Sequence, residues 1–234
     1  SPLFRIEIQS IWAERIGHLA IEPELFLSKR RDVPQKRTRT IFFSYAPYCN
    51  EFLLTMWRRV LPMGPSWLLR PTYEANKRWP WLNISAQGWD EEHFDLRSLD
   101  DAPPHVAFTP EEAERGRRLL RDLGVPDGVP FVCLAVRDGA YLRAAEPGKN
   151  WSYHDYRDSH IATYAAMADH LAQAGYAVLR MGALVSEPLK ADSPLVIDYA
   201  NSHLRSDFGD IFLFAHCTFC ISTSALSAEV RVTS

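Results

Sequence analysis

The chain has 234 residues, a formal net charge of −3 and a hydrophobic content of 47%. This length suits one large or two small domains, and the weak negative charge gives no general attraction to nucleic acid or to an anionic membrane. We expect no membrane span and no signal peptide, because no apolar run is long enough. The four cysteines lack disulfide-framework spacing, which favours a reducing, cytoplasmic location.

The N-terminal segment predicts a strand, a turn and a helix. Apolar residues over 3–12 indicate the strand, and a turn at 15–18 leads into a helix that ends near residue 30. Gly17 would allow a positive φ or a close backbone approach in this turn. His18, directly after it, either faces a ligand or packs against the helix.

A basic stretch, residues 29–39, follows this helix. It is interpreted first as a solvated loop and alternatively as a contact for phosphate or for an anionic membrane surface. The stretch lacks the interleaved aromatic residues of a single-strand nucleic-acid groove, so we expect no nucleic-acid partner. The membrane alternative would place the protein peripherally on an inner membrane.

The remainder of the first half predicts one more strand and helix before an irregular region. Residues 40–45 form an apolar strand-like run, and residues 50–61 have one apolar helical face. Residues 62–110 are rich in Pro and Trp, which predicts an irregular, partly helical region. Its aromatic side chains could stack on a sugar, although core packing is the favoured explanation for most of them.

The second half is organised around a strand–loop–helix–strand unit over 130–182. An apolar run at 131–136 is followed by a loop, by an amphipathic segment over 161–172 and by a second apolar run at 177–179. Gly175 lies where a helix C-cap belongs. This alternation predicts parallel strands, and hence an α/β fold.

Further elements flank this unit. Thr109, Pro110 and two acids mark the start of a helix that runs to about residue 123. After the unit we expect a strand at 195–197, a helix from residue 206, a strand over 216–221 and a last helix that opens at residue 222.

Four loops of the second half follow apolar strands directly, and would meet at the carboxyl edge of a parallel sheet. Arginine supplies bidentate donors and a helix start supplies free N–H groups, which together suit a diphosphate. Aspartates there could bind sugar hydroxyls or orient the arginines. The residues concerned are Arg137 and Asp138, Arg180 and Gly182, Asp198, and Ser222, Thr223 and Ser224.

Other interpretations of these residues stay open. The Arg/Asp pairs could form a structural ion-pair network, and the Ser/Thr run after residue 221 could be a plain N-cap. Asp158 or Ser159 is most simply the N-cap of the central helix. Cys217 and Cys220 have no second cysteine pair, so buried thiols are favoured over a metal site. The chain has no GxGxxG motif and no P-loop.

The segment over 132–226 resembles a family of bacterial glycosyltransferases. Family members share R-D-x-x-Y, YR(D/N)S-x-I-x-x-Y, G-Y-x-V-x-R-M-G and D-Y-A-x-S…S-D-F-x-D-I motifs. The R-I-G-H-L sequence at 15–19 is similar to the opening of the family. The matching residues here are Arg137–Tyr141, Tyr156–Tyr164, Gly175–Gly182, and Asp198–Ser202 with Ser206–Ile211.

This resemblance implies a metal-independent glycosyltransferase of the GT-B type, with two Rossmann-like halves and no cofactor besides its nucleotide-sugar donor. The halves would be an acceptor-side domain over 1–104 and a donor-binding domain over 105–234. Tyr141 joins the donor residues named above, and His18 is the candidate base. The acceptor would be a glycan, a lipid-linked glycan or another cell-surface precursor.

The C-terminal part departs from the family pattern. Relatives carry a Ser/Thr-Gly element, whereas Ser224 is followed by Ala225 and Leu226. The sequence therefore predicts a shortened C-terminal half. The alternative function is a non-catalytic or degenerate module that binds a nucleotide or a glycan.

Overall fold

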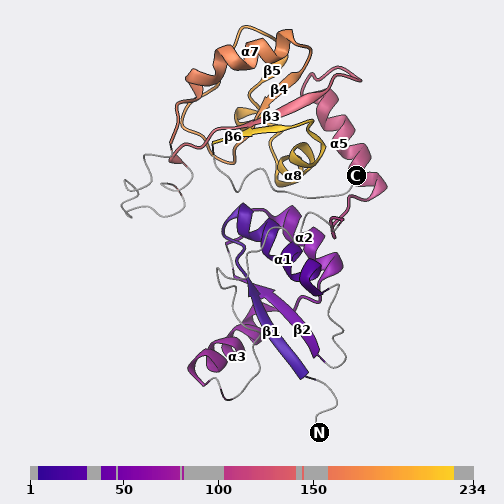
Figure 1. Cartoon of the computed structure of the whole chain (residues 1–234), viewed down its shortest axis with the longest axis vertical. Helices are drawn as coiled ribbons and strands as arrows, with labels where there is room; N and C mark the ends of the chain where they lie inside the picture. Colours follow the sequence, from indigo (N-terminus) through magenta and orange to yellow (C-terminus); the bar gives the residue numbers. More distant parts are fainter. Residues whose placement is uncertain are drawn as a thin grey trace. The chain divides into compact units, whose positions relative to one another are not determined.

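The chain divides into two compact units, one ending at Ala107 and the other beginning at Phe108. The sequence analysis expects this boundary between residues 104 and 105. Both units are α/β with parallel strands (Figure 1), as expected for Rossmann-like halves. The computed structural model describes residues 5–30, 38–45, 47–79, 81, 103–140, 144 and 158–223.

The first unit is built on two parallel strands covered on both faces. Adjacent phenylalanines of the second strand point to opposite faces, as the strand period of two requires. Phe42 packs edge-on against Phe26 with ring centroids 4.8 Å apart, and Phe43 packs against Tyr73 at 5.3 Å. Burial on both faces explains the continuous apolar run TIFF. The elements are β1 (Arg5–Ile11), α1 (Ile16–Arg30), β2 (Thr38–Ser44), α2 (Glu51–Val60) and α3 (Ser66–Arg78).

Two details of the first unit test the sequence predictions. The predicted turn at 15–18 is wrong, because α1 begins at Ile16 and Gly17 lies in its first turn. The helix predicted over 50–61 is confirmed as α2. Its N-cap is Asn50, whose side-chain oxygen accepts a hydrogen bond of 2.8 Å from the Leu53 amide.

The second unit holds a four-stranded parallel sheet in the order β5-β4-β3-β6. The helix α7 lies on one side of this sheet and α8 on the other (Figure 1). The elements are α5 (Pro110–Asp122), β3 (Phe131–Ala135), η4 (Ile161–Tyr164), α7 (Ala165–Gln173), β4 (Ala177–Arg180), β5 (Val196–Ile197), η5 (Tyr199–Asn201), α8 (Asp207–His216) and β6 (Cys220–Ser222).

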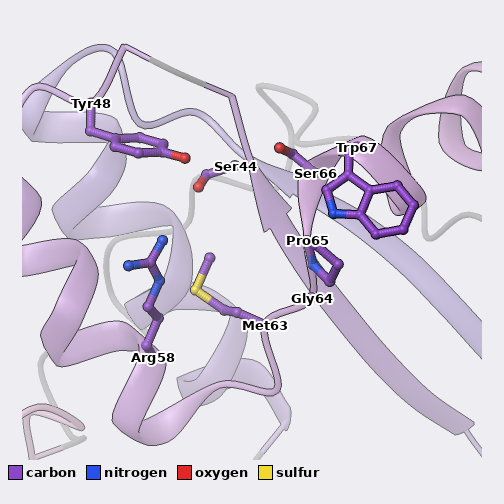
Figure 2. Close-up of a pocket in the computed structure, with 8 residues that line it drawn as sticks. All are labelled: Ser44, Tyr48, Arg58, Met63, Gly64, Pro65, Ser66 and Trp67. Carbon is purple, nitrogen blue, oxygen red and sulfur yellow. The ribbon is translucent and has the colours of Figure 1, made fainter.

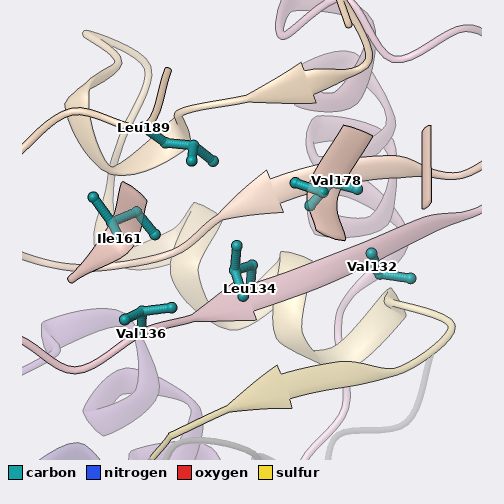
Figure 3. Packing of buried hydrophobic residues seen from close by; sticks show 7 residues of the cluster. Val132, Leu134, Val136, Ile161, Val178 and Leu189 are labelled. Atoms are coloured by element: carbon teal, nitrogen blue, oxygen red, sulfur yellow. The ribbon is translucent and has the colours of Figure 1, made fainter. Parts of the chain in front are cut away.

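Alternate side chains of β3 pack on opposite faces of this sheet. On the α7 face, Val132 and Leu134 belong to a buried cluster that includes Val178 of β4 (Figure 3). On the α8 face, the thiol of the fully buried Cys133 donates to the carbonyl of Leu213 at 3.5 Å. Because both faces are covered, β3 reads as an unbroken apolar run.

Several predicted boundaries in this unit are confirmed and others are corrected. Thr109 and Glu112 form a reciprocal capping box at the start of α5, and Gly175 has a φ of +93° after α7. The predicted central helix begins instead as the 3-10 turn η4. The strand expected over 216–221 is shorter, because α8 continues to His216 and β6 begins only at Cys220.

Candidate functional site

The carboxyl edge of the second sheet contains a topological switch point. The chain runs from β3 to β4 on one side, and β6 then adds to the other side of β3. The connections therefore diverge at β3, and open parallel sheets bind ligands in the crevice that such a divergence leaves beyond the strand ends. The loops that follow β3 and β6 border this point.

A hydrogen bond joins the two loops that border the switch point. The backbone N–H of Arg137, after β3, donates to the Thr223 hydroxyl, after β6, at 2.9 Å. The Arg137 side chain lies 3.5 Å from the carboxylate of Asp158. The prediction of an N-cap at Asp158 or Ser159 is wrong, because His160 occupies that position before η4 and no side chain caps it.

Arg180 is held inside the protein at the end of β4. Its side chain is 1% exposed, and its Nη1 donates to the carbonyl of Glu187 at 2.6 Å. Nη1 also lies 3.3 Å from Asp198, and Nη2 lies 3.8 Å from Asp138. Arg180 therefore has the structural ion-pair arrangement that the sequence left open as an alternative to a ligand contact.

The two aspartates near Arg180, Asp138 and Asp198, accept hydrogen bonds from the neighbouring loops. Asp138 Oδ2 accepts from both the amide and the hydroxyl of Ser186, each at 2.9 Å. Asp198 Oδ2 accepts from the Leu189 amide at 2.8 Å and from the Asn201 side chain at 2.7 Å. These bonds link the loops that follow β3, β4 and β5 into one connected edge.

The other predicted donor residues lie at the same edge or outside the described part of the chain. Gly182 follows β4 with a φ of +157°, and a Cβ atom there would approach Val185 Cγ1 to 2.6 Å. This position therefore requires glycine. Ser222 is the last residue of β6. Tyr141 and Ser224 lie outside the described residues, as do residues 31–37 of the basic stretch.

The first unit holds His18 in a defined orientation. His18 lies in the first turn of α1, beyond the carboxyl end of β1. Its Nδ1 is 2.8 Å from Oε1 of Glu22, a carboxylate that is 2% exposed. Glu22 Oε2 also accepts from the Trp12 amide at 3.3 Å, and the Trp12 ring stacks on the imidazole with centroids 4.5 Å apart.

This arrangement fixes the chemistry available to His18. A buried carboxylate on Nδ1 holds the proton there and leaves Nε2 as the basic nitrogen. Nε2 has no hydrogen-bond partner among the described residues. Glu22 was not predicted as a site residue, although its i,i+4 spacing from His18 on a helix is a signal that could have indicated it.

Two further features bear on metals and on membranes. Within the described ranges, no group of three His, Cys, Asp or Glu side chains is arranged to hold a metal ion. In the same ranges, no helix combines the length and apolar character that a membrane span requires. Cys217 and Cys220 are half-buried and not fully buried as predicted, and partial burial raises the pKa of the Cys220 thiol to about 11.

Comparison with solved structures shows that the two α/β units with parallel strands have a fold of the two-domain GT-B type. The chain aligns over 99% of its residues with a glycosyl transferase family 9 protein from Veillonella parvula DSM 2008, covering 79% of that chain, with a TM-score of 0.51 and 10% identity. It also aligns over 96% of its residues with the ADP-heptose lps heptosyltransferase II of E. coli, covering 82% of that chain, with a TM-score of 0.52 and 14% identity.

Likeness at such low identity defines the fold and leaves the reaction to be argued from the site. No protein-family model matches the chain, and no curated protein sequence matches it significantly.

Proposed function

We propose that this protein is a glycosyltransferase that moves a sugar from a nucleotide-activated donor to a glycan or to another cell-surface precursor. The observation that carries the proposal is the fold, which two glycosyltransferases share with nearly the whole chain. The residues at the switch point and at His18 add chemistry to that likeness. Neither feature alone would distinguish a transferase from a binding module.

The donor nucleotide would bind at the carboxyl edge of the β5-β4-β3-β6 sheet. Arg137 and the loop of Thr223 border the switch point, where they can donate to a diphosphate. Arg180 would act as a positioning residue, because its guanidinium is occupied by protein partners. The remaining proposed donor-side residues are Asp138, Tyr141, Gly182, Asp198, Ser222 and Ser224.

His18 would act as the general base. Its Nε2 would take the proton of the acceptor hydroxyl while that oxygen forms a bond to the anomeric carbon of the donor. The bond from this carbon to the nucleotide diphosphate would break, and the diphosphate would leave with the electron pair. Glu22 would hold the imidazole in the tautomer this step needs and would stabilise the imidazolium that forms.

Three finer parts of the proposal come from the sequence. They are the metal independence of the reaction, the cytoplasmic location and the contact of residues 29–39 with an anionic membrane surface. A reaction that runs at full rate in excess EDTA would support the first. The other two stay predictions.

A thermal-shift series with nucleoside diphosphates, with and without Mg²⁺, tests the donor site. Ligand at one hundred times its Kd stabilises by about 2.7 kcal/mol, which is roughly 5–10 °C in Tm for a chain of this size. We expect one diphosphate to give such a shift and Arg137→Ala to abolish it. Arg117→Ala, an exposed arginine on α5, is the matched control. No shift with any diphosphate would contradict the donor site.

A transfer assay then separates the enzyme from the alternative function. Release of nucleotide diphosphate that depends on an acceptor would establish the reaction, and His18→Ala should lower kcat by about 10²–10⁴-fold without weakening donor binding. Donor binding without acceptor-dependent release across the acceptor panel would instead indicate a non-catalytic module.

A further inference from the structure

A pocket of about 330 Å³ lies at the carboxyl end of β2, and His18 is not among its lining residues. It is bordered by the end of β2, the loop that follows β2, the last turn of α2 and the segment from the end of α2 to the start of α3 (Figure 2). Its lining residues are Ser44, Tyr48, Arg58, Met63, Gly64, Pro65, Ser66 and Trp67.

The frame of this pocket is held by main-chain bonds. The Phe42 amide donates to the Pro62 carbonyl at 2.9 Å, and the Gly64 amide donates to the Phe42 carbonyl at 2.8 Å. The segment after α2 therefore runs parallel to β2 beside its end. A Cβ atom at Gly64 would lie 2.6 Å from Leu69 Cδ1, so a side chain there would require Leu69 to move.

Polar groups converge inside the pocket. Figure 2 shows the Arg58 guanidinium and the hydroxyls of Tyr48 and Ser44 directed toward one another across the space. The Ser66 hydroxyl is a fourth donor in the lining. The Ser44 residue is 5% exposed, and its hydroxyl borders the pocket, where a ligand could accept its hydrogen bond.

The pocket lining carries one charge, that of the solvent-exposed residue Arg58. Arg58 has no ion-pair partner among the described residues, and none of the lining residues is an aspartate or a glutamate. One guanidinium and three hydroxyls offer several donors to a single acceptor-rich group. Phosphate and carboxylate oxygens satisfy such a set, whereas a neutral hydroxyl would leave the charge unpaired.

We propose that this pocket binds the anionic group of a charged acceptor sugar, either a phosphoryl group or a carboxylate. That the bound sugar is an acceptor rests on the proposed function, whereas the anion site itself is inferred from the pocket alone. Trp67, which is 76% exposed at its rim, offers an apolar surface to an attached sugar ring. The pocket thereby selects acidic sugars over neutral ones.

Calorimetric titration of the full chain, with no nucleotide present, tests this site. The probes are glucose 6-phosphate, glucuronate, glucose and inorganic phosphate. We expect both charged sugars to bind at least about tenfold more tightly than glucose, because a charge-assisted bond is lost with the neutral sugar. Inorganic phosphate should bind more weakly than glucose 6-phosphate. Equal affinity for these two would overturn the assignment to a sugar.

Two variants and one control locate the binding. Arg58→Ala should weaken binding of glucose 6-phosphate by about tenfold or more, and Ser44→Ala by about fivefold. The control is Arg59→Ala, which removes the same charge from the next residue of α2 outside the pocket lining. Equal affinity losses in Arg58→Ala and Arg59→Ala would reject the pocket, because only a general charge effect would then be seen.

The result is separable from the transferase proposal. Binding of the charged sugar by a chain that binds no nucleotide would retain the anion site and reject the donor site. If the chain showed acceptor-dependent transfer and Arg58→Ala left the affinity for glucose 6-phosphate unchanged, the transferase proposal would be retained and the anion site rejected.

Discussion

Arg180→Ala should destabilise the second unit severely. The wild-type guanidinium is 1% exposed and lies between two carboxylates, those of Asp138 and Asp198, which are 14% and 16% exposed. Removing one partner of a buried pair costs about 3–5 kcal/mol, because the remaining charges are left unpaired in a poorly solvated place. A domain of ordinary stability has only about 5–15 kcal/mol in total.

Urea unfolding followed by far-UV circular dichroism measures this loss. Six of the seven tryptophans precede Ala107, so tryptophan fluorescence would report mainly on the first unit. The matched control is Arg117→Ala, which also removes an arginine from an ion pair, here with Glu114 at 2.9 Å. The Arg117 side chain is 57% exposed. We expect the control to cost no more than about 1 kcal/mol.

The comparison of the two variants decides the role of Arg180. If Arg180→Ala were no more destabilising than Arg117→Ala, the ion pairs at the end of β4 would not hold the loops, and the argument for a positioning role would fail. Arg180→Lys is a second test: it keeps the charge but loses the fork that reaches three partners, so we expect an intermediate loss.

Three further predictions concern His18, the α5–α8 contact and Asp210. Glu22→Gln should lower kcat, since Glu22 no longer orients the His18 ring and the imidazolium that forms loses its carboxylate; an unchanged kcat would remove Glu22 from the mechanism. Gly116→Ala should cost about 1–3 kcal/mol in urea unfolding despite better helix propensity, because its Cβ would overlap the Phe212 ring; a stabilised variant would contradict this contact. Burial raises the pKa of Asp210 from 3.8 to about 6. The folded state therefore binds this proton more tightly than the unfolded state, so the contribution of Asp210 to the free energy of unfolding is full below about pH 4 and falls by roughly 3 kcal/mol as pH rises through 6. Asp210→Asn should remove this part of the pH dependence, and the same slope in the variant and the wild type would contradict the raised pKa.

The fold was largely predictable because local rules and tertiary packing agree in this chain. Apolar runs bounded by turn residues became the strands of both sheets, and the Thr109 capping box marked α5 as expected. The failures lie at short elements. Gly17 suggests a turn because glycine permits a positive φ, yet packing of α1 against β1 extends the helix across it.

The candidate site was predictable in position but not in contacts. Strand ends located Arg137, Arg180 and Asp198 at one edge, because parallel strands deliver their carboxyl ends together. Whether an arginine faces a ligand or its own loops depends on tertiary partners that a sequence does not display. The carbonyl of Glu187, for example, meets Arg180 only because the loop after β4 folds back. No sequence motif indicates the pocket beside Ser44, because its lining residues come from four separate segments of the chain.

The pairing of the arginines at the donor edge has a kinetic consequence. Arg137 and Arg180 each face a carboxylate, so their charges largely cancel within a few ångströms among the described residues. Such a surface does little to steer an approaching anion, and the association rate of a donor should vary weakly with ionic strength. Arg58 has no such neighbour in the described residues, so the capture of an acidic sugar in the first unit should slow markedly as salt is added. The two substrates of one reaction would then respond differently to the ionic strength of the medium.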